Sequence, residues 1–239
     1  MIKLISIISL FIAVFASCHA RISGVLQGNG QADLQISASL EPRMATLLKR
    51  LSNVSGDGQT DISFLDGPAI SASFSNAPGV TSVNLKNTSV NAIEGPVKIL
   101  NVNTFLSHNI AASEKSFINF TQNNSGTGRC TVNLDLKSGP LILANISPDI
   151  TEYLSALMAP IATGEILTKN KYLQEVSSVY GKHIADEIAA ARLLASIEFP
   201  GTVTSVKGGT FSGRKADFNI PLLDILVLET PLSYEVEWR

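Results

Sequence analysis

The sequence of 239 residues predicts an α+β fold, in which a largely antiparallel β-sheet carries amphipathic helices packed on one face. Segments near both ends of the chain alternate apolar and polar residues with period two, which is typical of half-buried strands. The segment between them, about 148–196, repeats apolar residues at the spacing of a helix. Short turns rich in glycine, asparagine and proline separate the strand segments, which favours antiparallel pairing.

The chain after residue 21 is predicted to form two strands and then a helix. A short strand is expected over 22–26, a turn at Gly28–Gly30, and a second strand over 32–40, where every other residue is apolar. The period then changes in the stretch PRMATLLKRLS, in which Pro42 suits a first helical turn. Its apolar residues share one face, so we expect this helix to pack on the sheet.

The middle of the chain is predicted to contain further strands. Residues 57–80 give no single prediction, because their alternation fits a strand whereas Asp66-Gly67-Pro68 can begin a helix. Strands are expected over 80–89 and 91–102, followed by a hairpin in which SFINFTQ and GRCTVNLDL flank the turn NNSGTG. Cys130 alternates in register with the apolar residues of its strand, which predicts a buried structural thiol.

The helical section is expected to begin at Pro148 and to end near Ser196. Pro160 should kink or end its first helix, and Gly181 can divide the longer helix over 171–196. Strands are predicted to follow, in SIEFPGTVTSV, TFSGRKADFNI, LLDILVLE and LSYEVEW, with a turn at Gly208-Gly209.

The first residues have the pattern of an export signal. One lysine at position 3 precedes an uncharged apolar run over 4–15, and Arg21 interrupts the chain before a spanning helix of about 20 apolar residues is reached. Cleavage is expected before Cys18, where FASC resembles a bacterial lipobox although Phe15 stands in the usual place of leucine. The signal is then 1–17, and Cys18 becomes an acylated N-terminus. Cleavage after Ala20, giving a signal of 1–20 and a secreted protein, is the alternative.

Composition restricts the function of the remaining single domain, 18–239. Only 16% of residues are charged and 45% are hydrophobic, so a large core is expected. The net charge of −2 argues against a nucleic-acid partner, which would require clustered Lys and Arg. Of the two cysteines, only Cys130 remains free once Cys18 is acylated or removed, so no disulfide is expected within the domain.

No catalytic, cofactor-binding or metal site is predicted, and no cofactor is expected. His183 and Glu187 lie one helical turn apart and can share a proton or half a metal site, but their position beside the apolar stripe favours a solvated helix face. Gly28-Asn29-Gly30 lacks the third glycine of a dinucleotide motif. The stretch SGRK, 212–215, lacks the partner motifs of serine enzymes that have Ser-x-x-Lys, and is interpreted as a hairpin turn.

The C-terminal stretch IEFPGTVTSVKGGTFSGRKADFNIPLLDILVLETPLSYEVEW resembles the end of LppM-type bacterial lipoprotein domains. The earlier stretch ADLQISASLEPRMATLLKRL is similar to them in its order of strand and helix. The resemblance implies an envelope lipoprotein with affinity for lipids or glycolipids. Such proteins often continue into a C-terminal membrane helix, whereas this chain ends at Arg239, so Cys18 would provide the anchoring alone.

These observations together predict a non-catalytic, lipid-anchored membrane protein of the bacterial cell envelope, facing the periplasm or the exterior. Its expected partners are the membrane, through the lipid on Cys18, and a lipid or glycolipid held in an apolar cavity. An exported hydrolase and a surface-exposed adhesin or antigen are the alternatives. A cleft that joins His183 or His108 to an acid and a serine would favour the hydrolase, and accessible strand edges without a cavity would favour the adhesin.

Overall fold

The computed structural model describes residues 19–54, 65–109, 117–123, 126–139 and 153–239. The fold is α+β, and antiparallel pairing dominates, as predicted. Within the described residues, no helix combines the length and apolar character required to cross a bilayer.

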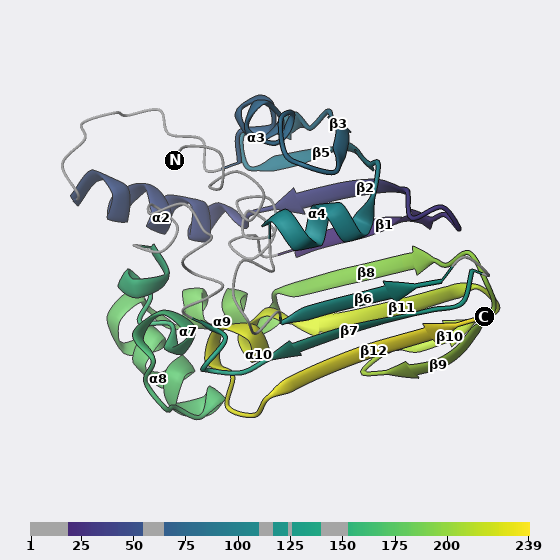
Figure 1. Ribbon diagram of the computed structural model, residues 1–239. Coiled ribbons are helices and arrows are strands. Elements are labelled where there is room, and N and C mark those ends of the chain that lie inside the picture. The colour runs from purple at the N-terminus through teal and green to yellow at the C-terminus, as the bar shows by residue number, and fades with distance from the viewer. Residues whose placement is uncertain (1–18, 55–64, 110–116, 124–125, 140–152) are drawn as a thin grey trace.

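The strands form two sheets rather than one (Figure 1). The large sheet is eight-stranded, in the order β10-β11-β8-β1-β2-β5-β3, with β4 also paired to β5. The small sheet is four-stranded, in the order β6-β7-β12-β9. The strands of the large sheet are β1 (His19–Leu26), β2 (Ala32–Ser39), β3 (Val80–Val83), β4 (Lys86–Ser89), β5 (Ala92–Ile99), β8 (Arg192–Glu198), β10 (Thr210–Ser212) and β11 (Lys215–Pro221). Those of the small sheet are β6 (Ile118–Gln122), β7 (Gly128–Leu134), β9 (Val203–Lys207) and β12 (Leu232–Trp238).

The centre of the large sheet joins distant parts of the chain. β1 pairs antiparallel with β2, from His19 opposite Ser39 to Leu26 opposite Ala32. On its other side β1 pairs in parallel with β8, where His19 lies opposite Arg192. The first strand of the domain is therefore held in place by a strand that follows the helical section.

The small sheet lies across one face of the large sheet, in front of β8 and β11 in Figure 1. On one side the sheets are linked by the turn from β9 to β10 at Gly208-Gly209. On the other side α4 (Val102–Asn109), which follows β5, contacts β6. Apolar side chains between the two layers contribute to a single core with the helices.

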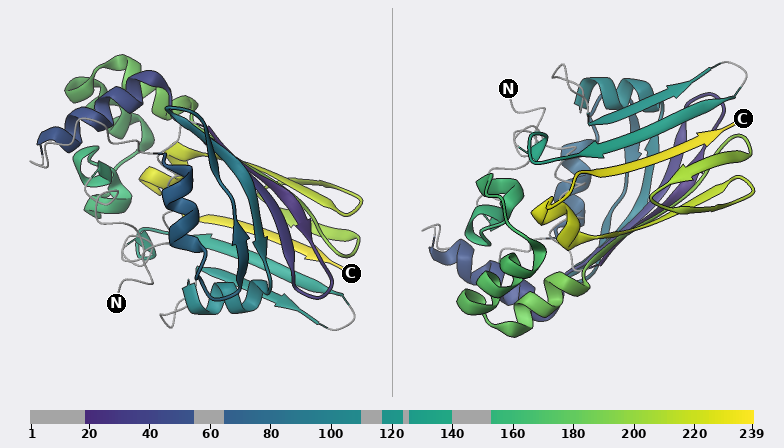
Figure 2. Two further views of the ribbon diagram at one scale, coloured as in Figure 1. Left: turned by 90° about the horizontal axis from the view of Figure 1, so that it is seen from above. Right: turned by 90° about the horizontal axis from the view of Figure 1, so that it is seen from below.

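Most helices gather at one end of the strands (Figures 1 and 2), where α8, α9 and α10 contact one another and α2 contacts α9. Local capping explains where they begin: Asp66 accepts a hydrogen bond from Ala69 at the start of α3, and Thr168 accepts one from Lys171 at the start of α8. Gly181, with φ of 91°, separates α8 from α9 as predicted. The helices other than α4 are α2 (Pro42–Val54), α3 (Gly67–Phe74), α7 (Pro160–Thr163), α8 (Lys169–Tyr180), α9 (Lys182–Ala190) and α10 (Leu222–Val227).

Some predicted elements were wrong. The helical section ends at Ala190 and not near 196, because Ala191 is extended and the next residues pair with β1. The stretch LLDILVLE, predicted as a strand, forms α10, whose buried Leu222, Ile225 and Leu226 have helical spacing. The helix α4 was not predicted. The predicted helix start at Pro148 lies outside the described residues, and Pro160 begins α7.

Candidate functional site

The strand registers define the side of each sheet that faces the other. In β2 the even-numbered residues face inward, since Ala32, Ile36 and Ala38 are buried whereas their neighbours are more exposed. The strand registers show which residues of β1, β8 and β11 lie on the same side of the large sheet. In the small sheet Cys130 faces inward, opposite Val236 on the neighbouring strand. The rings of Phe218 from the large sheet and Tyr234 from the small sheet meet edge to face, at 85° and with centroids 6.0 Å apart.

The apolar side chains in the middle of the inward faces are only half-buried, although they point at the opposite sheet. This set is called the inter-sheet lining. Ala216, on the same face of β11 and opposite Ile197, is fully buried with 0% exposure, so half-burial does not extend over the whole face. The inter-sheet lining consists of Ile22, Leu34, Ala195, Ile197 and Phe218 from the large sheet and Ile118, Phe120, Cys130, Val132 and Tyr234 from the small sheet.

The polar groups of the inter-sheet lining are neutral. Burial raises the pKa of the Cys130 thiol to about 11. The pKa of Tyr234 is also raised, chiefly by burial and further by the negative charge of Asp224. Neither group ionises near neutral pH, so the lining has the character of an apolar surface.

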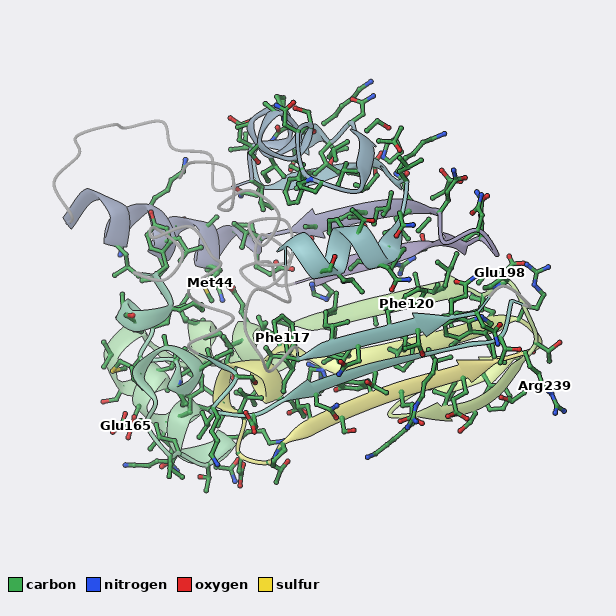
Figure 3. The ribbon with its side chains drawn as sticks, in the orientation of Figure 1. Met44, Phe117, Phe120, Glu165, Glu198 and Arg239 are labelled. Carbon is green, nitrogen blue, oxygen red and sulfur yellow. The ribbon has the colours of Figure 1, made fainter. Side chains whose placement is uncertain are left out.

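Aromatic rings pack together at the end of the two sheets that lies away from the helices. The ring of Trp238 packs against Phe199, with centroids 4.8 Å apart, and against Phe120 at 5.9 Å. Trp238 is 1% exposed. Its ring lies over Gly128, where a Cβ atom would overlap the indole, so glycine is required at that position. Figure 3 shows this end at Glu198 and Arg239, opposite Met44 and Glu165 at the helical end.

The outward face of the large sheet carries two open hollows. One, of about 690 Å³, extends from Arg21 and Leu194 to the β9–β10 turn, and its floor includes Ser196, whose hydroxyl donates to Asp217 at 2.7 Å. The other, of about 280 Å³, extends from the same Arg21 and Leu194 to the start of β1 and to Thr88. Each hollow combines polar side chains such as Arg21 with apolar ones, and the larger hollow also includes Ala195 and Phe218 of the inter-sheet lining.

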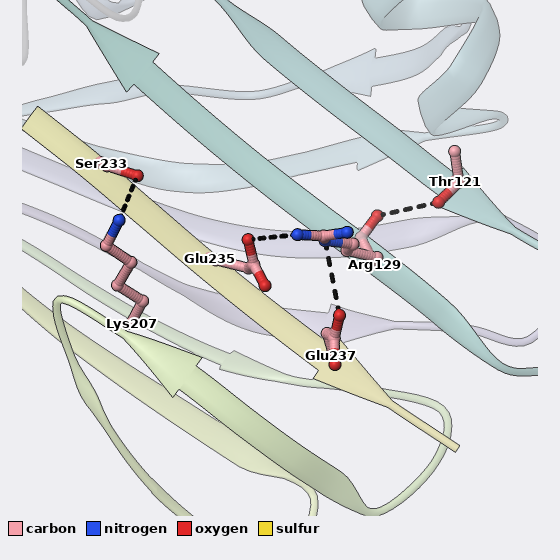
Figure 4. A network of polar contacts seen from close by, with 6 residues as sticks. All are labelled: Thr121, Arg129, Lys207, Ser233, Glu235 and Glu237. Carbon is pink, nitrogen blue, oxygen red and sulfur yellow. Dashed lines mark hydrogen bonds and ion pairs between the residues drawn. The ribbon is translucent and has the colours of Figure 1, made fainter.

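The outward face of the small sheet carries a row of ion pairs (Figure 4). The Arg129 guanidinium contacts Glu235 at 2.7 Å and Glu237 at 3.4 Å, and its pKa is raised by the hydrogen bond to Glu235. Lys207 donates to the Ser233 hydroxyl at 3.1 Å. Such exposed pairs align neighbouring strands in solvent, and we assign no ligand to them.

The His183 and Glu187 pair lies on α9. His183 is exposed, as expected for a solvated helix face, but Glu187 has a structural contact: its Oε2 accepts a hydrogen bond from the Met44 backbone N–H at 3.1 Å. Partial burial raises the pKa of Glu187, which this hydrogen bond opposes. The carboxylate therefore ties α9 to the first turn of α2, a contact that sequence spacing could not reveal.

The other residues singled out by sequence are placed as follows. Cys18 and the side chain of His108 lie outside the described part of the molecule. Ser212 lies opposite Lys215 in the β10–β11 hairpin, and Gly28–Gly30 forms the turn between β1 and β2, so both turn interpretations are confirmed. Among the residues that the structure describes, no three His, Cys, Asp or Glu side chains form a group able to hold a metal ion.

Sequence reasoning found Cys130 and Val132 on the apolar side of their strand but missed the lining as a set. Its members come from strands far apart in the chain, and each has the same alternation as an ordinary core residue. Half-burial depends on the separation of two sheets, and no local pattern encodes it.

Comparison with known proteins gives a weak likeness of fold. No family model matches the sequence, and no curated protein matches it. Among solved structures, the chain is similar to the folded domain of LppM from Mycobacterium tuberculosis, determined by NMR. The match covers 92% of this chain and 88% of that one, at 14% sequence identity and a TM-score of 0.37. At these values the likeness is weak and concerns the fold alone.

Proposed function

We propose that this protein is a non-catalytic, lipid-anchored protein of the bacterial cell envelope that binds the acyl chain of a lipid or glycolipid between its two sheets. The half-burial of the inter-sheet lining carries the proposal. An alkyl chain placed there would cover apolar surface that the protein leaves accessible, and each CH₂ removed from water contributes about 0.8 kcal/mol.

The chemistry of the lining supports an alkyl ligand over a polar one. Its side chains are aliphatic or aromatic, apart from a thiol and a phenol that stay neutral. Charged side chains such as Arg129, Glu235 and Glu237 lie on the outward faces instead. A headgroup would therefore remain outside the lining while the chain enters it.

The position of β1 supports acylation at Cys18 over cleavage after Ala20. β1 begins at His19, and Ala20 is 3% exposed and lies opposite Ala38 and Leu193. Cleavage after Ala20 would remove two paired residues from the centre of the large sheet. Cleavage before Cys18 leaves the strand whole.

Lipid binding is tested by native mass spectrometry of protein purified from membranes, with Ala195→Phe compared with Gln35→Phe. Ala195 belongs to the lining, whereas Gln35 is exposed on the outward face of β2 and lines neither hollow. We expect a non-covalently bound lipid in the natural protein, a loss on the order of tenfold in Ala195→Phe, and normal occupancy in Gln35→Phe. Equal occupancy in both variants would place the lipid elsewhere.

Anchoring is tested separately by radiolabelled palmitate incorporation and intact-mass analysis. We expect a labelled product that begins at Cys18, and no label in Cys18→Ser. An unlabelled product that begins at Arg21 would contradict the proposed lipid anchor, but it would not decide whether the inter-sheet lining binds lipid.

A further inference from the structure

We infer that the corner of the large sheet where β1 begins is seated on an anionic bilayer, with the smaller outward hollow receiving a phospholipid headgroup. The inference rests on the proposed acylation of Cys18. It goes further because it says which surface meets the membrane and which lipid charge that surface selects.

The first argument is the length of the tether. β1 is paired from its first residue, since His19 lies opposite both Ser39 and Arg192. Adjacent Cα atoms are about 3.8 Å apart, so an acylated Cys18 has no linker between its lipid and the sheet. The surface around His19 is therefore held at the headgroup layer, within the Debye length of about 8 Å over which charges act at physiological ionic strength.

The second argument is the set of basic side chains at this corner. His19, Arg21 and Arg192 all line the smaller hollow. The Arg192 Nη1 donates to the carbonyls of Ala189 and Ala191, at 2.7 and 2.8 Å, and no ion pair within the described ranges of the chain includes it. Arg21 is exposed, and no carboxylate lies within ion-pair distance of it among the described side chains.

The carboxylates near the hollow reduce this charge but do not cancel it. Glu94, on β5, lines the hollow and lies opposite Lys86 on β4. Glu41 is 4.0 Å from the His19 ring. Arg43 lies within electrostatic reach of Glu187, and Lys86 lies opposite Glu94. The excess of positive charge therefore comes from Arg21 and Arg192, which line a hollow of about 280 Å³ that is open toward solvent.

The third argument is the contrast with the opposite end of the strands. Three cations there are paired within the protein: Lys98 is 3.7 Å from Asp33, Arg129 is 2.7 Å from Glu235, and Arg214 is 3.3 Å from Glu198. Arg239 at that end is exposed and belongs to none of the ion pairs among the described residues. Arg21 and Arg192 differ from it because they lie beside the first residue of β1, where the tether holds them at the bilayer.

The test uses the acylated full chain in vesicles of neutral phosphatidylcholine with or without phosphatidylglycerol. A fluorophore is attached at Thr88→Cys, in the hollow, or at the matched Thr202→Cys, whose backbone pairs with Arg239 at the opposite end. Both threonines are exposed, and the raised pKa of Cys130 keeps that thiol from competing for the label. A quencher carried on lipid headgroups reports which fluorophore lies at the bilayer.

We expect strong quenching at position 88, increased by phosphatidylglycerol, and little at position 202. Arg21→Glu should lower the seated population about fivefold for each unit of charge lost, whereas Arg239→Glu at the opposite end should leave it unchanged. Equal quenching at both positions of an acylated protein overturns the seat and leaves the anchor intact. A protein without acyl chains overturns both.

A final measurement distinguishes binding of a bilayer headgroup in the hollow from binding of free phosphate. Inorganic phosphate in excess over the lipid should leave the quenching at position 88 unchanged. If it returns the signal to that of neutral vesicles, the hollow is a site for the free anion, and the inference of a membrane seat is wrong.

Discussion

The helical end and the inter-sheet space are built from the same apolar residue types but are packed differently. At the helical end Tyr172, Val176 and Val227 have 0% exposure and Ile188 has 2%. Between the sheets Ile197 and Val132 keep accessible surface while facing other apolar groups. Dense packing at one end supplies stability, and the apolar surface that stays accessible between the sheets is where the proposed ligand would bind.

The largest effect is expected from removing apolar volume at the helical end. Ile188→Ala should lower the free energy of unfolding by about 2–5 kcal/mol, because a fully buried side chain leaves a cavity. Ile197→Ala, the matched change in the inter-sheet lining, should cost about 1 kcal/mol because less apolar area is lost. Urea denaturation of both variants checks this, and similar losses would contradict the contrast between the two regions.

Replacing a small side chain by a larger one should give a smaller difference in stability between two neighbouring strands. Ala216→Leu should destabilise the protein by about 1–3 kcal/mol, since Ala216 has 0% exposure and no room for a larger side chain. Ala195→Leu, on the adjacent strand β8 and the same face, should change stability by about 0.5 kcal/mol or less. A larger loss in Ala195→Leu than in Ala216→Leu would mean that the two sheets are closely packed at Ala195.

The Cys130 thiol should report the environment between the sheets through pH. Its pKa is raised from 9.0 to about 11 by burial, so the neutral thiol favours the folded state below pH 9 and this stability is lost as pH rises toward 11. At pH 8 its reaction with a disulfide reagent should be about a hundredfold slower than that of an exposed cysteine, in proportion to the thiolate fraction. Cys130→Ala should remove the alkaline loss, and rapid labelling at pH 8 would contradict burial.

The smallest effect is expected on the outward face of the small sheet. Arg129→Ala removes contacts with Glu235 and Glu237 that are exposed to solvent and screened by salt. We expect no change in lipid occupancy and little change in the urea midpoint, with any loss smaller at high salt. A large, salt-independent loss would show that this row of ion pairs supports the fold as strongly as the helical end does.

The local sequence pattern was sufficient to predict elements whose interacting residues lie close together in the chain. The turn at Gly28–Gly30, the hairpin around Cys130 and the break at Gly181 could be predicted, because short spacing and turn residues determine them. The first half of β8 could not be predicted, since residues 192–195 continue a helical apolar spacing and become a strand through pairing with β1 and β11.

The candidate site was less predictable than the fold for a related reason. The sequence identifies apolar sides of strands, and Cys130 and Val132 were assigned correctly to one. How closely the opposite sheet packs against these residues depends on other parts of the chain, among them the ring of Trp238. The hydrogen bond between Glu187 and Met44 likewise joins helices that no short-range pattern relates.

The parallel pairing of β1 with β8 has a consequence for the order of folding. The first strand to emerge from the ribosome finds one of its two neighbours only when residues 192–198 have been synthesised. Such long-range closure is slow compared with helix or hairpin formation. The nascent chain therefore lacks the centre of its large sheet until most of its length has been made.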